Sequence, residues 1–289
     1  MSARTTDSGV DTIQLEMKGV VDTDKINDNS ILKNKTRFTK DNNTKIGYIV
    51  GLENGKRRLS TIQETIEFIK EKRKRGEVVG LCRLDVAVDF METLEEKRNL
   101  FRMLLECLAK EKKIVKDVFA TVKGIAIKGN LKISNNRLEY TIYNHEDKTE
   151  RKGCSRLEVH NNDLRVKDIT KKVIEEKTLG FITDLKECVK YMEQIEENYI
   201  NGLEQKYQET KGNFRTFSEF VAWADYEGYI MTSEILKGLI KRVGIKSTYN
   251  SFRDMFKRNR KETLKFTSRK ELETTIKNIE KELKKCVKN

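Results

Sequence analysis

Residues 80–90, GLCRLDVAVDF, alternate apolar side chains with polar or small ones. An alternation of period two is typical of a strand with one buried face. One face of this strand then carries Leu84, Val86, Val88 and Phe90, and the other carries Arg83, Asp85, Ala87 and Asp89. Because the apolar face is enough to form a core, the two carboxylates on the opposite face are the first candidates for a function.

The same alternation recurs on both sides of this strand and predicts a sheet. Further segments of period two, up to about residue 165, are 13–17, 45–52, 124–128, 136–145 and 155–162. The polar residues 18–44 are expected to form a loop without chemistry. The order of strands, together with two interrupting helices, predicts an α+β fold with a largely antiparallel sheet.

Two helices are expected within this first part of the chain. Residues 60–76 begin with Ser60 as N-cap and have Gln63 at the capping-box position, and they end at Gly76. Residues 93–113 carry an apolar stripe that is expected to pack on the sheet, made of Leu100, Met103, Leu104, Cys107 and Leu108.

From about residue 168 the apolar period changes to 3.6, which predicts helices. Residues 168–209 are expected to form a helical arm broken near Gly180, with Tyr191 packed against its surroundings. We therefore expect three parts: an α+β domain at 1–165, a helical connector at 166–212 and a basic, all-helical domain at 213–289.

Residues 233–259 have the pattern of a helix-turn-helix, although an ordinary pair of packed helices fits them too. The inward positions and the turn are Ile235, Leu239, Ile240, Gly244 and Ile245, followed by Ser247 as the cap of a second helix with Tyr249, Phe252, Met255 and Phe256 on its apolar side. In a helix-turn-helix, the residues expected to face the major groove are Lys246, Ser247, Asn250 and Arg253, and those expected to meet phosphates are Lys257, Arg258 and Arg260.

The charge of the chain favours a polyanionic partner. Its net charge is +13 over 289 residues. Residues 241–289 contain 16 lysines and arginines against 6 acids, a net charge of +10. Such a concentration of positive charge next to a helix-turn-helix pattern indicates nucleic acid, and double-stranded DNA first.

Several classes of protein and site are disfavoured by what the sequence lacks. It has no apolar run of membrane-spanning length and no apolar core at its start, so we expect a cytoplasmic protein. The 5 cysteines are scattered without disulfide or zinc spacing. No Walker A or G-x-G-x-x-G motif is present, which argues against a nucleotide-driven helicase. His145 and His160, the two histidines, do not have the spacing of a His-hydrophobic-His nickase, and His160 lacks the arginine of a tyrosine recombinase.

The acidic strand needs a neighbour to build a metal site. Asp85 and Asp89 are four residues apart, roughly 13 Å along a strand, too far to hold one ion together. In residues 155–162, alternation leaves Arg156, Glu158 and His160 on the polar face, and in residues 136–145 it leaves Arg137, Glu139, Tyr143 and His145 there. If these strands are adjacent, Asp85 and Glu158 could share Mg²⁺ or Mn²⁺, with Asp89 as a further carboxylate, and activate a phosphodiester.

These motifs resemble a known family. RLDVAVDF, then a hairpin ending in TIYNHEDKTER, then SRLEVHNNDLRV, look like the R-x-D-x-x-x-D strand, hairpin and R-x-E strand of Rep_trans-type replication initiators of rolling-circle plasmids and related mobile-element relaxases. The resemblance covers roughly residues 80–165. It implies an origin-binding protein that nicks one DNA strand with a tyrosine, uses a divalent metal held by acids, and recognises its origin through a helical C-terminal part. The matching positions are Arg83, Asp85, Asp89, Tyr143 and Glu158.

The chain departs from the family at the nucleophile. Family members carry the tyrosine about ten residues beyond the R-x-E glutamate, and VHNNDLRVKDI has none. Tyr143 is the tyrosine that alternation puts on the acidic face, with Arg83 or Arg156 to offset developing charge. Two functions stay open: an initiator that nicks its origin, and a non-catalytic origin-binding initiator or regulator of a mobile element. An RNA-binding protein is a third alternative. A host helicase and a second copy of the chain are the further partners expected, and a membrane is not.

Overall fold

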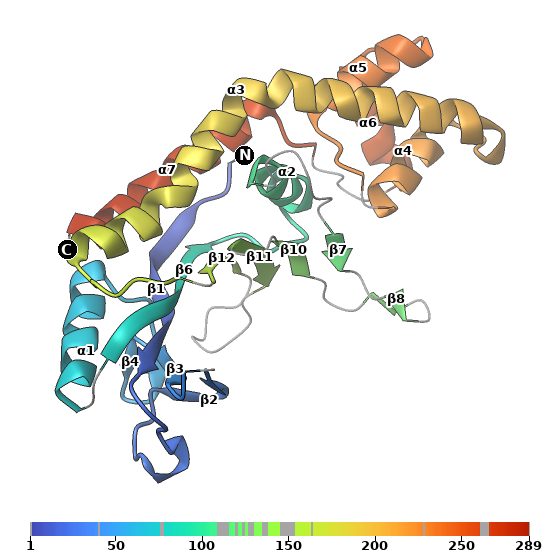
Figure 1. The fold of residues 1–289 in the computed structure, drawn as a ribbon. Coiled ribbons are helices and arrows are strands. Elements are labelled where there is room, and N and C mark those ends of the chain that lie inside the picture. Colours follow the sequence, from blue (N-terminus) through green and yellow to red (C-terminus); the bar gives the residue numbers. More distant parts are fainter. Residues whose placement is uncertain are drawn as a thin grey trace.

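The computed structural model describes most of the chain. The described residues are 2–39, 41–75, 78–108, 116–118, 121–122, 125–126, 130–134, 138–144, 154–162, 164–227, 229–260 and 266–288, with no account of the side chains at 75, 116–134, 188 and 255–260. The predicted α+β class is confirmed, because a large antiparallel sheet is followed by helices (Figure 1).

The sheet has eight strands in the order β2-β3-β1-β6-β12-β11-β10-β7. Its strands are β1 (Thr5–Met17), β2 (Ile31–Phe38), β3 (Thr44–Ile49), β6 (Val78–Phe90), β7 (Lys116–Val118), β10 (Asn130–Ser134), β11 (Leu138–Asn144) and β12 (Ser155–Asn161). Two small ladders join β4 (Leu52–Glu53) to β5 (Lys56–Arg57) and β8 (Thr121–Val122) to β9 (Ile125–Ala126). Every strand pair of the described sheet is antiparallel.

Strand β6 lies in the middle of this sheet, between β1 and β12. Its alternation works as the sequence predicts: Leu84, Val86, Val88 and Phe90 are all at most 1% exposed. The neighbouring strands send their own apolar side chains to the same core, from Leu157 and Val159 on β12 and from Tyr140 and Ile142 on β11. The opposite face of these three strands is therefore left to their polar residues.

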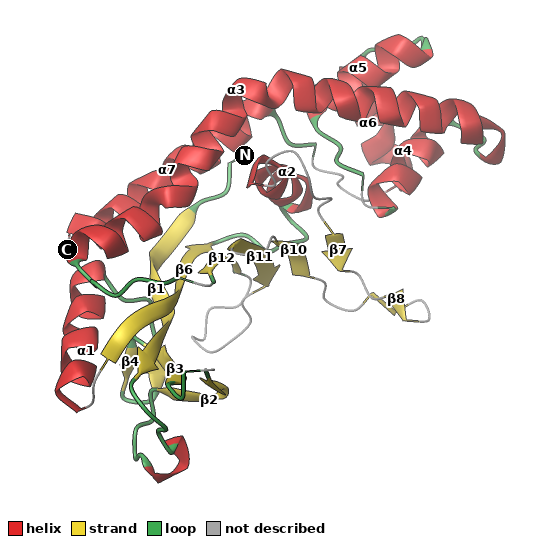
Figure 2. Ribbon diagram, in the orientation of Figure 1, coloured by secondary structure: helices red, strands yellow, loops and turns green. Residues whose placement is uncertain are grey.

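Helices cover the apolar side. They are α1 (Ile62–Arg75), α2 (Arg98–Leu108), α3 (Lys171–Thr210), α4 (Phe217–Tyr226), α5 (Ser233–Val243), α6 (Tyr249–Arg260) and α7 (Arg269–Lys288), with short 3-10 turns at Thr23–Lys25 and Lys211–Asn213. The predicted stripe of α2 is buried throughout, and Phe101 packs on Phe90 with ring centroids 5.1 Å apart. Figure 2 shows α7 and α3 running side by side past the N-terminus.

The first residues of the chain are bound to its last helix. The backbone N–H of Ala3 donates to Thr275 on α7, and Asn278 on the same helix donates to the Ala3 carbonyl, both at 3.0 Å. Helix α7 also lies against β1 and β6. The α+β part and the helical part thus share one continuous hydrophobic core.

The prediction that residues 18–44 form a loop is wrong, because β2 lies within them and pairs with β3. This segment is also anchored to α1. Lys72 is buried, donates to Asp28 at 2.6 Å and lies 4.5 Å from the ring centroid of Phe68. The strand was missed because its side chains, ILKNKTRF, do not alternate in polarity, so that only backbone pairing marks it.

Two helix boundaries differ from prediction by one residue. Helix α1 is capped by Thr61, whose hydroxyl accepts from the Glu64 N–H while the Glu64 carboxylate accepts from the Thr61 N–H. Ser60 instead bridges to Val10 on β1. Helix α6 is capped by Thr248, whose hydroxyl accepts from the Ser251 N–H. In both places the residue after the predicted cap has the geometry for the cap hydrogen bond.

Helix α3 runs for 40 residues without the break predicted at Gly180. A glycine inside a helix costs about 1 kcal/mol relative to alanine, and the packing of α3 along α7 and α5 offsets such a cost. Tyr191 on this helix is 61% exposed, so the expectation that it packs against its surroundings is wrong.

The C-terminal helices pack around aromatic side chains. Phe217 of α4 lies against Phe252 of α6, and Tyr207 of α3 against Phe220, with ring centroids 5.3 and 5.0 Å apart. Helix α5 ends at Gly244, which has φ +73°, a conformation that glycine adopts readily and other residues seldom do. None of the described helices combines the length and apolar character that a membrane crossing requires.

Candidate functional site

The polar face of β6, β12 and β11 forms one cluster of charged side chains. The predicted adjacency of these strands is confirmed, with β12 paired to β6 on one side and to β11 on the other. Their register sets His160 opposite Asp85, and Arg156 opposite both Asp89 and Tyr143. The sequence motifs therefore meet on one face of the sheet.

Asp85 is the most buried acid of the cluster, with its side chain 2% exposed. One of its oxygens accepts from Arg83 Nε at 2.6 Å and lies 3.1 Å from His160 Nδ1, and the other accepts from Lys35 Nζ at 3.3 Å. Burial alone would raise the pKa of Asp85, but its interactions with His160 and Arg83 outweigh burial and lower the pKa to about 2. Asp85 is therefore a fixed negative charge.

Asp89 and Arg156 form a buried two-point ion pair. Arg156 Nε donates to Oδ1 of Asp89 at 2.6 Å, and its NH2 group donates to Oδ2 at 3.0 Å. Burial lowers the pKa of Arg156, but the hydrogen bond to Asp89 outweighs this effect and leaves the pKa above its usual value. The NH1 group of Arg156 also lies 3.4 Å from Asp11, which accepts from Arg57. This row of alternating charges joins β6, β12 and β1.

Tyr143 and Glu158 form the closest contact between polar side chains here. The Tyr143 hydroxyl donates to Oε1 of Glu158 at 2.5 Å, and Oε2 of Glu158 lies 3.4 Å from Nε2 of His160. Burial raises the pKa of Glu158, and the hydrogen bond from Tyr143 offsets only part of this rise. Burial, and then the Glu158 charge, raise the pKa of Tyr143. Contacts therefore run without a gap from Tyr143 through Glu158 and His160 to Asp85.

The three predicted metal ligands, Asp85, Asp89 and Glu158, do not form a joint ligand set. The imidazole of His160 lies between Asp85 and Glu158, where the shared cation was expected. Both oxygens of Asp89 accept from Arg156. Each carboxylate oxygen of the three thus already faces a donor of the chain. Within the described residues, no group of three or more His, Cys, Asp and Glu side chains is placed to hold a metal ion.

Sequence reasoning missed three residues of this cluster: Asp11, Lys35 and Arg57. Asp11 lies at a register shift of β1, between Val10 and Thr12, which turns its side chain to the polar face. Lys35 comes from the segment expected to be a loop, and Arg57 from the short strand β5. The one signal available was Gly47, since a glycine inside a strand often marks a close backbone approach.

The predicted DNA-contacting residues lie around the start of α6. Lys246 and Asn250 are exposed, and Ser247 and Arg253 are half-buried. Arg253 pairs with its neighbour Asp254 at 3.3 Å. The side chains of Lys257, Arg258 and Arg260 lie outside the described residues, as do Arg137 and His145 of the predicted polar face.

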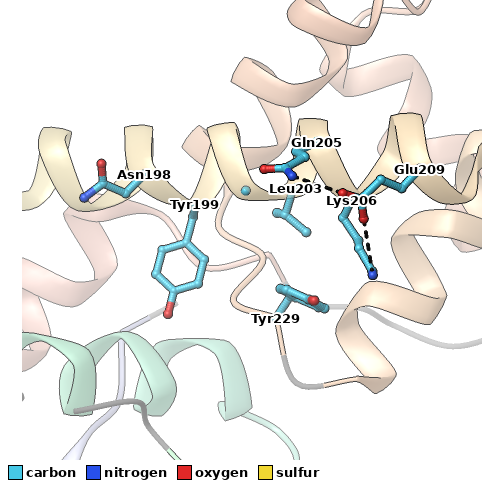
Figure 3. A pocket seen from close by; sticks show the side chains of 8 residues that line it. Asn198, Tyr199, Leu203, Gln205, Lys206, Glu209 and Tyr229 are labelled. Atoms are coloured by element: carbon cyan, nitrogen blue, oxygen red, sulfur yellow. Dashed lines mark hydrogen bonds and ion pairs between the residues drawn. The ribbon is translucent and has the colours of Figure 1, made fainter. Parts of the chain in front are cut away.

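A separate hollow lies along α3 (Figure 3). It has a volume of about 450 Å³ and is lined by Asn198, Tyr199, Gly202, Leu203, Gln205, Lys206, Glu209 and Tyr229. Gln205 and Lys206 both donate to Glu209 within it. The Tyr199 hydroxyl points away from the other lining side chains, toward α2, where burial and the charge of Glu106 raise its pKa. Glu209 is thus the acceptor for two neighbouring side chains of its own helix.

Comparison with known proteins finds a match among solved structures. No family model matches the chain, and neither does any curated protein. Among solved structures, the rolling circle replication initiator protein from Geobacillus stearothermophilus matches over 62% of this chain and 84% of its own, with 13% identity and a TM-score of 0.38. A likeness at this level assigns no role to individual residues, whose chemistry follows from their own geometry.

Proposed function

We propose that this chain is a DNA replication initiator of a plasmid or another mobile element, and that it breaks one strand at Tyr143. The observation that carries the proposal is the 2.5 Å hydrogen bond from the Tyr143 hydroxyl to Glu158. A nucleophile paired with a base, which is oriented in turn by a third group, is the arrangement expected for covalent catalysis. His160 is the orienting group here, since it contacts both Glu158 and Asp85.

The reaction would use these groups in a defined order. Glu158 takes the proton of the Tyr143 hydroxyl, and burial favours this step because it raises the pKa of Glu158. The Tyr143 oxygen bonds to the phosphorus while the bond from phosphorus to the 3′ oxygen breaks. The released 3′ oxygen takes up a proton, and the 5′ end of the strand stays attached to Tyr143.

Arginines of the same face support this chemistry electrostatically. Arg156 lies opposite Tyr143 in the ladder, and its charge partly offsets the burial that raises the pKa of the Tyr143 hydroxyl. Arg83 is 23% exposed and could reach the charge that develops on the phosphate. Mg²⁺ or Mn²⁺ is expected from the acidic strand pattern and from the family resemblance, so the nicking assay includes arms with each ion and with a chelator.

Origin binding would rest on the C-terminal helices. Helices α5 and α6 join at Gly244, and Lys246 and Asn250 lie exposed at this junction. We propose that they act as a helix-turn-helix, with Lys246, Ser247, Asn250 and Arg253 at the base edges of duplex DNA. The net charge of +10 over residues 241–289 favours such contact.

Nicking of supercoiled DNA tests the catalytic part of this proposal. The substrate is a plasmid that carries the DNA flanking this protein's gene, incubated with Mn²⁺, Mg²⁺ or a chelator. The intact protein should produce open circles that retain protein after denaturation. Tyr143→Phe should lower the rate at least a hundredfold, while Tyr191→Phe, which changes the next tyrosine along the chain, should leave it unchanged. Equal rates in the two variants would remove Tyr143 from the mechanism.

A non-catalytic origin-binding initiator or regulator is the second candidate. Two observations favour it: burial raises the pKa of Tyr143, which opposes its ionisation, and every carboxylate oxygen of Asp85, Asp89 and Glu158 is paired. Glu158→Ala and Asp85→Ala separate the candidates. If the protein is catalytic, the two variants should still bind DNA but no longer cleave it. If the second candidate is right, the unmodified protein should also bind DNA without cleaving it.

A further inference from the structure

Strand β2 contains a bulge, residues 33–36, that folds over the polar face of the sheet. The register passes from Leu32 opposite Gly47 to Arg37 opposite Lys45, so four residues of β2 face a single residue of β3. A Cβ atom placed on Gly47 would lie 2.7 Å from the Cβ of Lys35, which shows how closely the bulge approaches the sheet. Gln14 of β1 holds it there through a 2.8 Å hydrogen bond to the Lys35 carbonyl.

The bulge brings Lys35 above the acidic cluster, and β5 brings Arg57 there as well. Lys35 Nζ lies 3.3 Å from Asp85, and Arg57 NH2 lies 3.0 Å from Asp11. The two cationic side chains are 30% and 28% exposed, whereas the carboxylates below them are 2% and 9% exposed. In each of these two pairs, solvent therefore reaches the cation more than the acid.

Neither Lys35 nor Arg57 is the only partner of its acid. Asp85 already accepts from Arg83 at 2.6 Å, and Asp11 already contacts Arg156 and accepts from the hydroxyl of Thr12 at 2.8 Å. The Nε of Arg57 has no hydrogen-bond partner among the described residues. This nitrogen is itself buried, so an anion approaching from solvent would meet the half-exposed side chains of Lys35 and Arg57 rather than that atom.

We infer that Lys35, Arg57 and Arg83 bind phosphates of a single-stranded nucleic acid that crosses the bulge toward Tyr143. This inference rests on the proposed function, since Tyr143 supplies the reason for a strand to enter the face. An unpaired strand fits better than a duplex, because the Tyr143 hydroxyl lies within the sheet face and a flexible backbone can reach it past cationic side chains.

Binding of a fluorescent 12-nucleotide oligothymidine over a salt series tests the inference. Lys35→Met and Arg57→Met should each weaken binding severalfold and reduce the slope of log K against log salt by about 0.7, the value for one phosphate contact on a single strand. Lys33→Met and Arg58→Met are matched controls. Each makes the same change in charge, Lys33→Met two residues from Lys35 and Arg58→Met one residue from Arg57. Lys33 pairs with Asp24 and Arg58 with Glu53 and Glu64, away from the cluster. Equal slopes in the two pairs of variants would overturn the inference.

A second measurement needs no variant and so does not depend on its folding. In the unmodified protein, the oligonucleotide should protect Lys35 from an amine-reactive reagent, as measured by mass spectrometry, and leave Lys33 reactive. Equal protection of both lysines, or of neither, would contradict a specific phosphate site. The inference and the proposed function can fail separately. If Lys35→Met and Arg57→Met change the salt slope but the protein does not nick DNA, the phosphate site stands without the catalytic function. If the protein nicks DNA but the slope does not change, the catalytic function stands without the phosphate site.

Discussion

The sheet face and the C-terminal helices carry their charges in opposite ways. On the sheet face, Asp89 and Arg156 are buried and pair across adjacent strands. On α6, Arg253 pairs with its own sequence neighbour Asp254, and the two side chains are 40% and 52% exposed. Salt screens exposed charges strongly and buried pairs much less. The comparison teaches that net charge marks the region proposed to bind a polyanion, whereas the fixed geometry of the proposed catalytic face lies among charges that nearly cancel.

The largest expected effect is on the free energy of unfolding, when one ion pair from each region is broken in turn. Asp89→Ala leaves the Arg156 guanidinium without its two-point partner in a buried place, and it should lower the free energy of unfolding by about 3 kcal/mol. Asp254→Ala removes the exposed partner of Arg253 and should cost less than about 1 kcal/mol. Urea unfolding of both variants measures the difference. Similar values would mean that burial does not distinguish the two regions.

The pH dependence of stability should report Asp85. Its pKa is lowered to about 2 in the folded protein, against about 3.9 in an unfolded chain. A carboxyl whose pKa is lowered by folding contributes stability that is fully present above the unfolded value and is lost as pH falls through the folded value. Between about pH 4 and pH 2 the unmodified protein should therefore lose on the order of 2 kcal/mol more than Asp85→Asn. Parallel unfolding curves for the two proteins over this range would contradict the prediction.

The smallest expected effect lies in the helical region, at the start of α6. Thr248→Ala removes the hydroxyl that accepts from the Ser251 N–H, and it should cost about 1 kcal/mol. Ser247→Ala, one residue earlier, should change the free energy of unfolding by less than about 0.5 kcal/mol. Thermal unfolding can compare the two. A larger effect at Ser247 would restore the cap expected from the sequence.

The sequence predicts the centre of the sheet well because a strong physical signal lies there. Leu84 to Phe90 alternate since one face of β6 is core, and the same holds for Leu157 and Val159 on β12. Side chains on the other face of adjacent strands must then meet, so Arg156, Glu158 and Asp85 could be grouped without coordinates. The alternation does not predict which side chains of the group contact one another, such as His160 between the carboxylates of Asp85 and Glu158.

The edge of the sheet is where prediction fails. Strand β2 does not alternate apolar and polar side chains, and it is held by backbone hydrogen bonds, which every sequence can form. Lys35 reaches Asp85 only because four residues of β2 leave the ladder and Gly47 lets them approach. Contacts made by a bulge depend on a register that local patterns do not encode.

The hydrogen bonds between Ala3 and helix α7 have a consequence for the order of assembly during translation. Residues 3 and 275 are among the most distant in sequence of any contacting pair described, and synthesis proceeds from the N-terminus. The segment that seals the start of β1 therefore leaves the ribosome long after β1 itself. Until α7 has been synthesised, part of the surface that it covers stays open to solvent, and the nascent chain is exposed there to aggregation and proteolysis.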